Sequence, residues 1–223
     1  MAIRSQKAEA TAFLRNRDRT GLLEWARSVR GPLRALISIT FDPVELMRWR
    51  AIEAVGWVVA TFAESNLDRV RDMLRRLFWQ MNDESGGLAW HAPELIGEIL
   101  VNVPVLIPEY ADLLLSSLRE EPFERGVHLA IYRIAQIDSK PFAERASELA
   151  NSVASPDPII RAFSALTLGE LKASAYCNIL KPLIKDQSQL RHYDFNNGDF
   201  VTLRISEAAR TAVEMIESKD RAA

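Results

Sequence analysis

The chain has little of what identifies several classes of protein. Among its 223 residues Cys177 is the single cysteine, which excludes an internal disulfide and a cysteine-based metal site. It contains no run of about 18 apolar residues, so the sequence predicts no membrane span. The N-terminal segment is charged at short intervals and lacks the apolar core of a signal peptide. These absences predict a cytoplasmic protein.

A charge excess of one sign is also missing. The net charge is −2, so the basic footprint expected of a nucleic-acid binder is absent overall. The first 34 residues are locally basic. This composition is typical of a solvated amphipathic helix. The alternative is a docking patch for an acidic partner.

Sequence motifs for catalysis are absent as well. The chain contains no nucleophile elbow, no phosphate-binding loop and no metalloprotease helix motif. A reactive thiol at Cys177 would need a cationic neighbourhood. We therefore expect no cofactor, and the sequence favours a binding protein over an enzyme.

What the chain does have is an internal repeat. Each copy has a small residue five places before its end, an aliphatic residue one place before, and an apolar residue two places after. The copies are MRWRAIEAVG (residues 47–56), LAWHAPELIG (88–97), GVHLAIYRIA (126–135) and IRAFSALTLG (160–169), with a weaker fifth, RISEAARTAV (204–213). The spacing of roughly 34 to 41 residues is that of two-helix solenoids.

The segments between the copies also have helical periodicity. The whole pattern predicts an all-α chain of about five helical hairpins, arranged as a right-handed α-solenoid. We expect a single domain over residues 1–223, with an N-terminal helical cap over about 1–30 and the repeats over about 31–216. The Asn197-Gly198 dipeptide is typical of a tight turn, so a loop or short hairpin is predicted near 192–203.

The repeats resemble those of the HEAT family, whose second helix reads V-R-x-x-A-A-x-A-L-G. The best match is IIRAFSALTLGEL (159–171), followed by LMRWRAIEAVGWV (46–58). The NDESGG…W…PE block also resembles that of bacterial HEAT-like proteins. The resemblance implies an armadillo-type α-solenoid, in a family whose members mostly bind proteins and in a few cases are enzymes.

Helical phase predicts which face of each second helix remains for a ligand. If the last residue of each copy is position zero, positions −9, −5, −1 and +2 form the core side, and −7, −3 and +1 point the other way. The latter positions hold Trp49, Glu53 and Trp57 in the first copy, Trp90, Glu94 and Glu98 in the second, and His128 and Tyr132 in the third. Because aromatic residues with polar handles are typical of binding surfaces, we expect these residues to line a concave groove.

Each of these residues also has an ordinary structural interpretation. Trp49 and Trp57 can be core residues covered by the N-terminal helices, through Trp25 or Phe13. The glutamates can be solvated, and His128 can be a hydrogen-bonded structural histidine. Glu94, Glu98 and His128 can also be viewed as a metal site, but acidic pairs four residues apart are common on helices, so no metal is predicted.

The stretch between the first two copies is rich in polar and glycine residues. It begins Asn82, Asp83, Glu84, Ser85 and continues with two glycines. A turn between helices explains this composition, since glycine permits positive φ and Ser or Asp can cap backbone N–H groups. Four successive polar side chains exceed the needs of a turn, so Asn82, Asp83 and Glu84 are included among the candidate binding residues.

Two classes of function remain open. The first is a non-enzymatic protein-binding scaffold, whose groove holds a protein or peptide segment and whose glutamates favour Lys or Arg in the partner. The second is a small-molecule binder or enzyme that uses the same groove, similar to the HEAT-like bilin lyases. A HEAT-like DNA glycosylase is disfavoured because the predicted groove is acidic.

Overall fold

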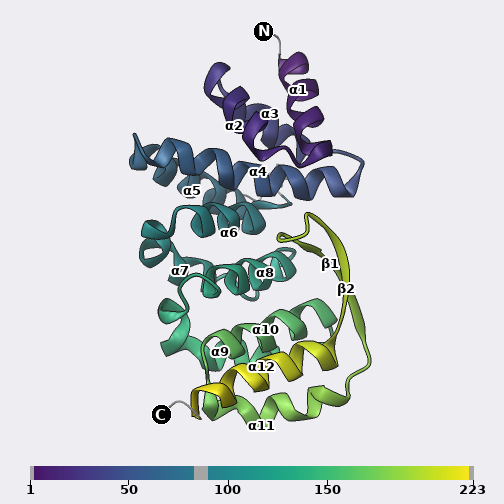
Figure 1. Cartoon of the computed structure of the whole chain (residues 1–223). Coiled ribbons are helices and arrows are strands. Elements are labelled where there is room, and N and C mark those ends of the chain that lie inside the picture. The colour runs from purple at the N-terminus through teal and green to yellow at the C-terminus, as the bar shows by residue number, and fades with distance from the viewer. Residues whose placement is uncertain (1–2, 83–89, 221–223) are drawn as a thin grey trace. The chain divides into compact units, whose positions relative to one another are not determined.

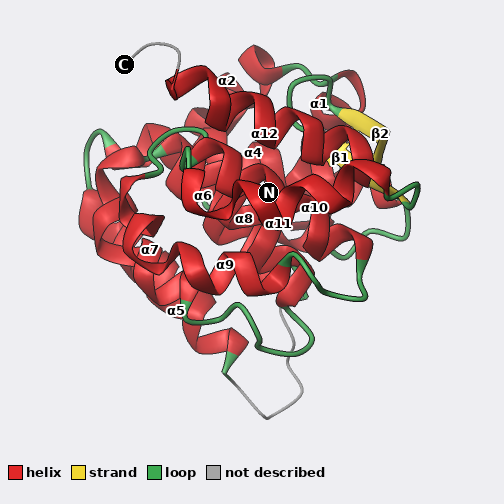
Figure 2. Ribbon diagram, turned by 90° about the horizontal axis from the view of Figure 1, so that it is seen from below, coloured by secondary structure: helices red, strands yellow, loops and turns green. Residues whose placement is uncertain are grey.

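The computed structural model describes residues 3–82 and 90–220. This part of the chain is largely helical (Figure 1). Its strands form one two-stranded sheet, drawn in yellow in Figure 2. The predicted all-α class, with a hairpin near the last helix, is confirmed.

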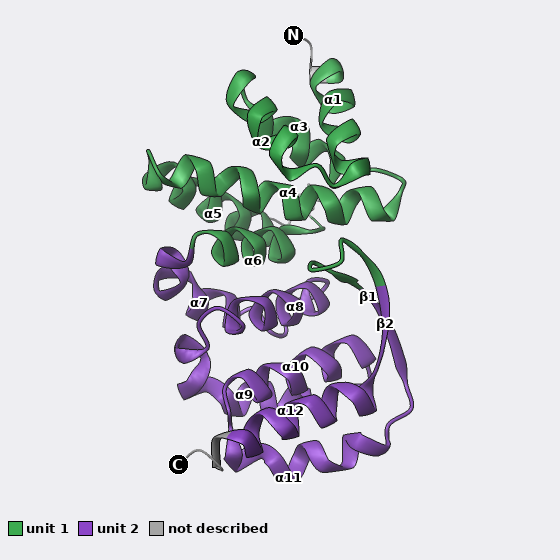
Figure 3. Cartoon of the chain, viewed as in Figure 1, with its two compact units in different colours: residues 1–103, 193–200 green, residues 104–192, 201–223 purple. Residues whose placement is uncertain are grey.

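The chain divides into two compact units, which are coloured separately in Figure 3. The first contains residues 1–103 and 193–200, and the second contains residues 104–192 and 201–223. Each unit is described by itself below. The prediction of a single domain over residues 1–223 stays a prediction.

The first unit contains the N-terminal helices and the first two helical hairpins. Its helices are α1 (Ile3–Asn16), α2 (Arg19–Ser28), α3 (Pro32–Ile39), α4 (Glu45–Ala63), α5 (Leu67–Met81) and α6 (Ala92–Asn102). The helices α1 and α2 pack on α4, and α1 also packs on α3. The second helices of the two hairpins, α4 and α6, pack on each other.

The second unit contains three further hairpins, whose first helices are short and partly 3-10 in geometry. Its elements are the 3-10 helix η1 (Pro104–Leu106), α7 (Ile107–Leu115), α8 (Glu124–Ala135), η2 (Lys140–Arg145), α9 (Ala146–Ser152), α10 (Pro158–Glu170), η3 (Ser174–Tyr176), α11 (Cys177–Leu180), η4 (Lys181–Lys185) and α12 (Ile205–Asp220). The second helices α8, α10 and α12 pack in that order. Asp157 caps α10 by accepting a hydrogen bond from the Ile159 N–H at 2.8 Å.

The strands are β1 (Gln189–Asp194) and β2 (Asp199–Arg204), which pair before α12 begins. The turn between them closes with a 2.7 Å hydrogen bond from the Gly198 N–H to the Asp194 carbonyl. Gly198 has φ 68°, in the left-handed region that glycine tolerates without strain. The Asn-Gly turn signal is therefore confirmed, and β1 begins three residues earlier than the predicted segment.

The start of the second helix in the second hairpin differs from the prediction. The sequence pattern places it near Leu88, whereas α6 begins at Ala92. Pro93 explains the difference, because a proline ring inside a helix clashes with the carbonyl four residues earlier and is tolerated only in the first turn. As a result, Trp90 lies in a turn before α6 and not on the helix itself.

Glycine ends the first and fourth copies of the repeat because second helices approach closely there. A Cβ atom on Gly56 would lie 2.7 Å from the Glu98 carbonyl oxygen of α6. A Cβ atom on Gly169 would lie 2.8 Å from the Ala212 Cα atom of α12. Both distances are below ordinary van der Waals contact, so a larger residue would force the helices apart.

This close approach predicts an unusual response to alanine. In an open helix, replacing glycine with alanine stabilises by roughly 0.5–1 kcal/mol. For Gly56→Ala and Gly169→Ala we instead expect the free energy of unfolding to fall by about 1–3 kcal/mol, because the added methyl group overpacks a helix interface. Urea unfolding of each variant measures the change, and a stabilised variant would show that the helices do not pack this closely.

Candidate binding site

Trp49 and Glu53 of the first repeat contact the β-hairpin. We call residues 193–200, which belong to the first unit, the hairpin tip. The Trp49 ring stacks on the Tyr193 ring with centroids 5.7 Å apart and an interplanar angle of 15°. Phe195 and Phe200 present their edges to Trp49 at centroid distances of 6.1 and 6.5 Å. The hairpin tip therefore covers Trp49.

Glu53 lies beside this aromatic cluster and is almost fully buried, with 3% of its surface exposed. Arg17 donates to both of its carboxylate oxygens, from Nη2 to Oε1 at 2.6 Å and from Nε to Oε2 at 3.2 Å. The Tyr193 hydroxyl donates to Oε2 at 2.9 Å. Burial raises the pKa of Tyr193, and the adjacent Glu53 carboxylate raises it further, so the phenol remains a donor. A bidentate guanidinium and a phenol together satisfy the buried carboxylate.

Two arginines also bind the backbone of the hairpin tip. Arg17 donates from Nη1 to the Asn196 carbonyl at 2.7 Å, and from Nη2 to the Phe195 carbonyl. Arg50 donates from Nε to the Gly198 carbonyl at 3.1 Å. The tip is thus held by aromatic stacking and by guanidinium hydrogen bonds to its carbonyl groups.

Arg17 adopts a backbone conformation that arginine rarely takes. Its φ is 51°, in the left-handed region, at the end of α1. The Arg17 N–H donates to the Leu14 carbonyl, and the Asp18 N–H donates to the Phe13 carbonyl. This is the hydrogen-bond pattern of a Schellman motif. That position usually carries glycine, so the backbone alone does not favour arginine here. The side chain, through Glu53 and the hairpin tip, accounts for it.

Trp57 contacts one of the N-terminal helices. Trp57 is half-buried, and the Arg19 guanidinium lies over its ring at 5.3 Å from the centroid. Phe13 and Trp25 contact each other, with ring centroids 6.4 Å apart. Since Tyr193, Phe195 and Phe200 cover Trp49, the covering residues come from the hairpin tip, which the sequence pattern did not associate with this face.

The second repeat carries the same tryptophan-glutamate pair, but fewer described side chains contact it. Trp90 is 55% exposed, and Glu94 is 8% exposed. His91 Nδ1 lies 3.5 Å from Glu94 Oε1. Within the described residues, Glu94 Oε2 is buried and has no hydrogen-bond partner, and the same holds for His91 Nδ1. Glu98 is buried on the same helix, with 2% of its surface exposed.

The two pairs occupy the same positions of the repeat in the sequence, although Trp49 lies on α4 and Trp90 lies in the turn before α6. Trp49 and Glu53 occupy positions −7 and −3 of the first copy, as Trp90 and Glu94 do in the second. The first carboxylate binds a guanidinium and a phenol, whereas the second has the imidazole of His91 at a longer distance. The second pair therefore has the same side chains without an aromatic cover or a close cationic partner among the described residues.

The remaining predicted residues lie elsewhere. His128 and Tyr132 belong to α8 in the second unit. His128 is buried, its Nδ1 lies 2.7 Å from the Glu124 carbonyl, and its Nε2 has no partner in the described chain. Burial lowers the pKa of His128. Half-buried Tyr132 stacks on Phe163 at 5.6 Å.

Asn82 follows the last residue of α5 and binds its own helix, since its Nδ2 donates to the Phe78 carbonyl at 2.9 Å. Asp83 and Glu84 lie outside the described residues.

Neither a metal-ligand cluster nor a long apolar helix is found in residues 3–82 and 90–220. No group of three or more His, Cys, Asp or Glu side chains there could hold a metal ion. No single helix there is long and apolar enough to cross a membrane. One bent pair of consecutive helical segments, Ala92–Asn102 and Pro104–Ser116, meets the criteria of length and composition together.

Comparison with known proteins supports the fold. No family model matches the sequence. A stretch of 103 residues is 34% identical to a protein of Archaeoglobus fulgidus named only as uncharacterized. The match covers 46% of this chain and 53% of the relative, so it spans about half the length of that protein. The bacterial origin suggested by the sequence stays a prediction.

Three solved structures similar to this chain are engineered or designed proteins, and two of them are armadillo repeat proteins. An engineered protein aligns over 98% of this chain and 92% of its own length, with a TM-score of 0.61 and 12% identity. A computationally designed armadillo repeat protein for modular peptide recognition aligns over 96% of this chain and 91% of its own, with a TM-score of 0.54 and 17% identity. A further designed armadillo repeat protein has a TM-score of 0.56 at the same identity. The chain therefore has an armadillo-like fold of repeated helical hairpins, which confirms the HEAT-like, armadillo-type prediction.

The ion pair beneath the hairpin tip is tested by Arg17→Gly. Glycine suits the left-handed backbone of this position, so a purely local effect would leave stability unchanged or raise it. We expect the free energy of unfolding to fall by about 2–4 kcal/mol, because the substitution leaves the buried Glu53 carboxylate without its cation. Chemical denaturation measures this change. A variant as stable as the parent would mean that the ion pair contributes nothing.

His128 predicts a pH dependence of stability. Its folded-state pKa is lowered below the ordinary 6.5, so the unfolded chain binds the proton more readily. The stabilisation from holding His128 neutral is therefore complete above about pH 6.5 and decreases as the pH falls toward the folded-state pKa. His128→Gln should reduce the loss of stability between pH 7 and 5, as measured by urea unfolding. An unchanged pH profile would contradict this assignment.

Proposed function

We propose that the chain is a non-enzymatic, cytoplasmic protein-binding repeat module that holds a partner segment at Trp90 and Glu94. The observation that carries this proposal is the equivalence of the two tryptophan-glutamate pairs. One pair binds the hairpin tip of the same chain, and the other has an exposed ring and a carboxylate oxygen without a partner in the described chain.

The first pair gives a precedent for the kind of segment that such a face binds. Tyr193 stacks on Trp49 and donates to Glu53, while the guanidinium of Arg17 neutralises the carboxylate. The segment bound there is a tight hairpin turn whose carbonyl groups accept from Arg17 and Arg50. This contact therefore combines an aromatic side chain that stacks on the tryptophan, a cation that pairs with the glutamate, and backbone carbonyl groups that accept hydrogen bonds.

The second pair favours a partner that supplies the missing elements. A buried carboxylate oxygen without a hydrogen bond is unfavourable, and a cationic donor from outside would relieve it. Exposed Trp90 offers a ring for an aromatic or guanidinium group to stack on. The proposed partner is therefore a protein or peptide segment with Lys or Arg next to an apolar or aromatic residue.

Of the other predicted residues, those in the first unit remain part of the proposed contact, and those in the second unit stay a separate prediction. Trp57 and Glu98 lie in α4 and α6, and His128 and Tyr132 lie in α8. The fold gives general support, since one similar solved structure is described as designed for modular peptide recognition. The enzymatic alternative has less support. Arg17 and Tyr193 both donate hydrogen bonds to the Glu53 carboxylate, which makes this group unsuited to act as a general acid or base.

Affinity capture with mass spectrometry tests the proposal. We expect the wild-type chain to enrich a partner that Trp90→Ala and Glu94→Gln both lose, by about tenfold or more, because each removes one anchor of the contact. Trp79→Ala is the matched control, since Trp79 is 65% exposed on α5 and belongs to neither pair.

All variants are first checked for an unchanged thermal unfolding midpoint. A partner that is retained by Trp90→Ala and Glu94→Gln, or lost equally with Trp79→Ala, rules out the proposed contact. Unfolding of Trp90→Ala would instead identify Trp90 as a core residue, and Glu94→Gln alone would then decide the outcome.

A further inference from the structure

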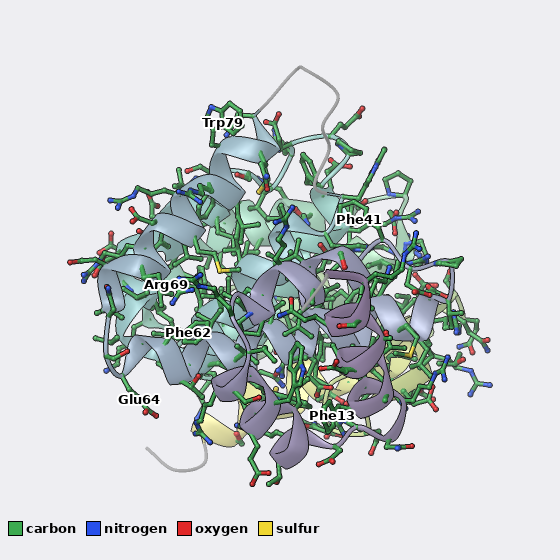
Figure 4. All side chains as sticks on the ribbon, turned by 90° about the horizontal axis from the view of Figure 1, so that it is seen from above. Phe13, Phe41, Phe62, Glu64, Arg69 and Trp79 are labelled. Carbon is green, nitrogen blue, oxygen red and sulfur yellow. The ribbon has the colours of Figure 1, made fainter. Side chains whose placement is uncertain are left out.

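The first unit contains a cavity of about 540 Å³ between α3 and α5. Its walls are residues of these two helices, and residues near the end of α4 and the start of α6 complete it. Phe41, Phe62 and Arg69, which line it, are labelled in Figure 4. None of the predicted tryptophan and glutamate residues lines this cavity.

Most of the cavity surface is apolar. Leu33 and Ile37 of α3 face it together with Phe62 and Met73, and all four are half-buried. Phe41, at the end of α3, is 57% exposed. A concave surface that leaves this much apolar side chain in contact with water is typical of a binding site.

Three of the four Arg and Asp side chains that line the cavity are arginines, and Thr40, Gln80 and His91 are its other polar side chains. Arg34 comes from α3, and Arg69 and Arg76 come from α5. In the part of the chain that the structure describes, none of these three arginines forms an ion pair with an acidic side chain. The Arg69 guanidinium lies over the Phe62 ring, 4.4 Å from its centroid. Asp72 is the acidic residue among those that line the cavity, and Arg75 pairs with it. The cavity therefore favours a ligand with negative charge.

The volume of the cavity suits a small ligand. The lining residues of α5 extend from Arg69 to Gln80, which corresponds to roughly 16 Å along a helix axis. Pockets for small molecules range from about 300 to 1,000 Å³, and this cavity lies within that range.

We propose that the cavity binds an anionic amphiphile of fatty-acid size. The alkyl chain would lie against Leu33, Ile37 and Met73, and the carboxylate would bind Arg34 or Arg76. Arginine suits this role because its planar guanidinium binds a carboxylate through two parallel hydrogen bonds. The inference does not depend on the Trp90–Glu94 contact, since neither of these two residues lines the cavity. His91, which lies 3.5 Å from Glu94, is among the residues that line it.

Binding of dodecanoate, below its micellar concentration, tests the proposal by isothermal titration calorimetry. We expect one saturable site. Met73→Trp should weaken binding by at least about tenfold by filling the cavity, and Arg34→Gln combined with Arg76→Gln should do the same by removing the cations. The double variant Arg4→Gln with Arg27→Gln is the matched control, because it removes the same charge from exposed positions outside the cavity.

Dodecylammonium, which has the same chain and the opposite charge, distinguishes specific from general apolar binding. It should bind at least about tenfold more weakly than dodecanoate. Absence of saturable dodecanoate binding, equal binding of dodecylammonium, or binding that Met73→Trp leaves unchanged would overturn the proposal. Thermal unfolding checks that every variant is folded. If Met73→Trp does not fold, the double variant Arg34→Gln with Arg76→Gln decides the outcome.

Discussion

Burying a carboxylate costs free energy unless a counter-charge and hydrogen-bond donors accompany it, and Glu53 imposes this constraint on the first unit. The required groups come from opposite ends of the chain. Arg17 stands at the end of α1, and Tyr193 lies in β1, 140 residues beyond Glu53. One side chain on α4 thus links the N-terminal helices and the hairpin tip to the first repeat. The left-handed backbone of Arg17 indicates that this link outweighs a local preference for glycine.

The same constraint explains why equivalent positions of the repeat differ in their surroundings. Position −3 is acidic in both of the first two copies, and it is buried in both. In the first copy the chain supplies the partners from its own distant segments. In the second copy the described residues supply His91, and an exposed tryptophan stands next to it. The proposed binding function follows from this difference, and without the repeat register the two pairs could not be compared.

Much of the fold follows from local sequence patterns. The period of the repeat, the cap at Asp157 and the Asn-Gly turn at 197–198 depend on residues close together in the chain, and the structure contains all three. The start of α6 was misplaced because Pro93 overrides a periodic pattern that continues through it. The first-helix segments of the second unit are periodic in sequence but include 3-10 turns.

The surroundings of the candidate site could not be predicted in the same way. Helical phase identifies the side of α4 that carries Trp49 and Glu53, but it does not show that residues 193–200 return to cover that side. The three aromatic residues Tyr193, Phe195 and Phe200 indicate that this segment is buried against another part of the chain. The sequence around them does not indicate which part that is. The cavity between α3 and α5 likewise depends on how far apart two helices lie, which periodicity does not specify.

The central claim is that Glu53 and the hairpin tip form one energetic unit through Tyr193 and Arg17. A double-mutant cycle on Glu53→Gln and Tyr193→Phe, measured by chemical denaturation, tests this most directly. The account predicts that the two substitutions are non-additive, with a coupling energy of about 1 kcal/mol or more, because they remove partners of the same buried hydrogen bond. Additive effects within about 0.3 kcal/mol would contradict it, since side chains that do not interact in solution behave in that way.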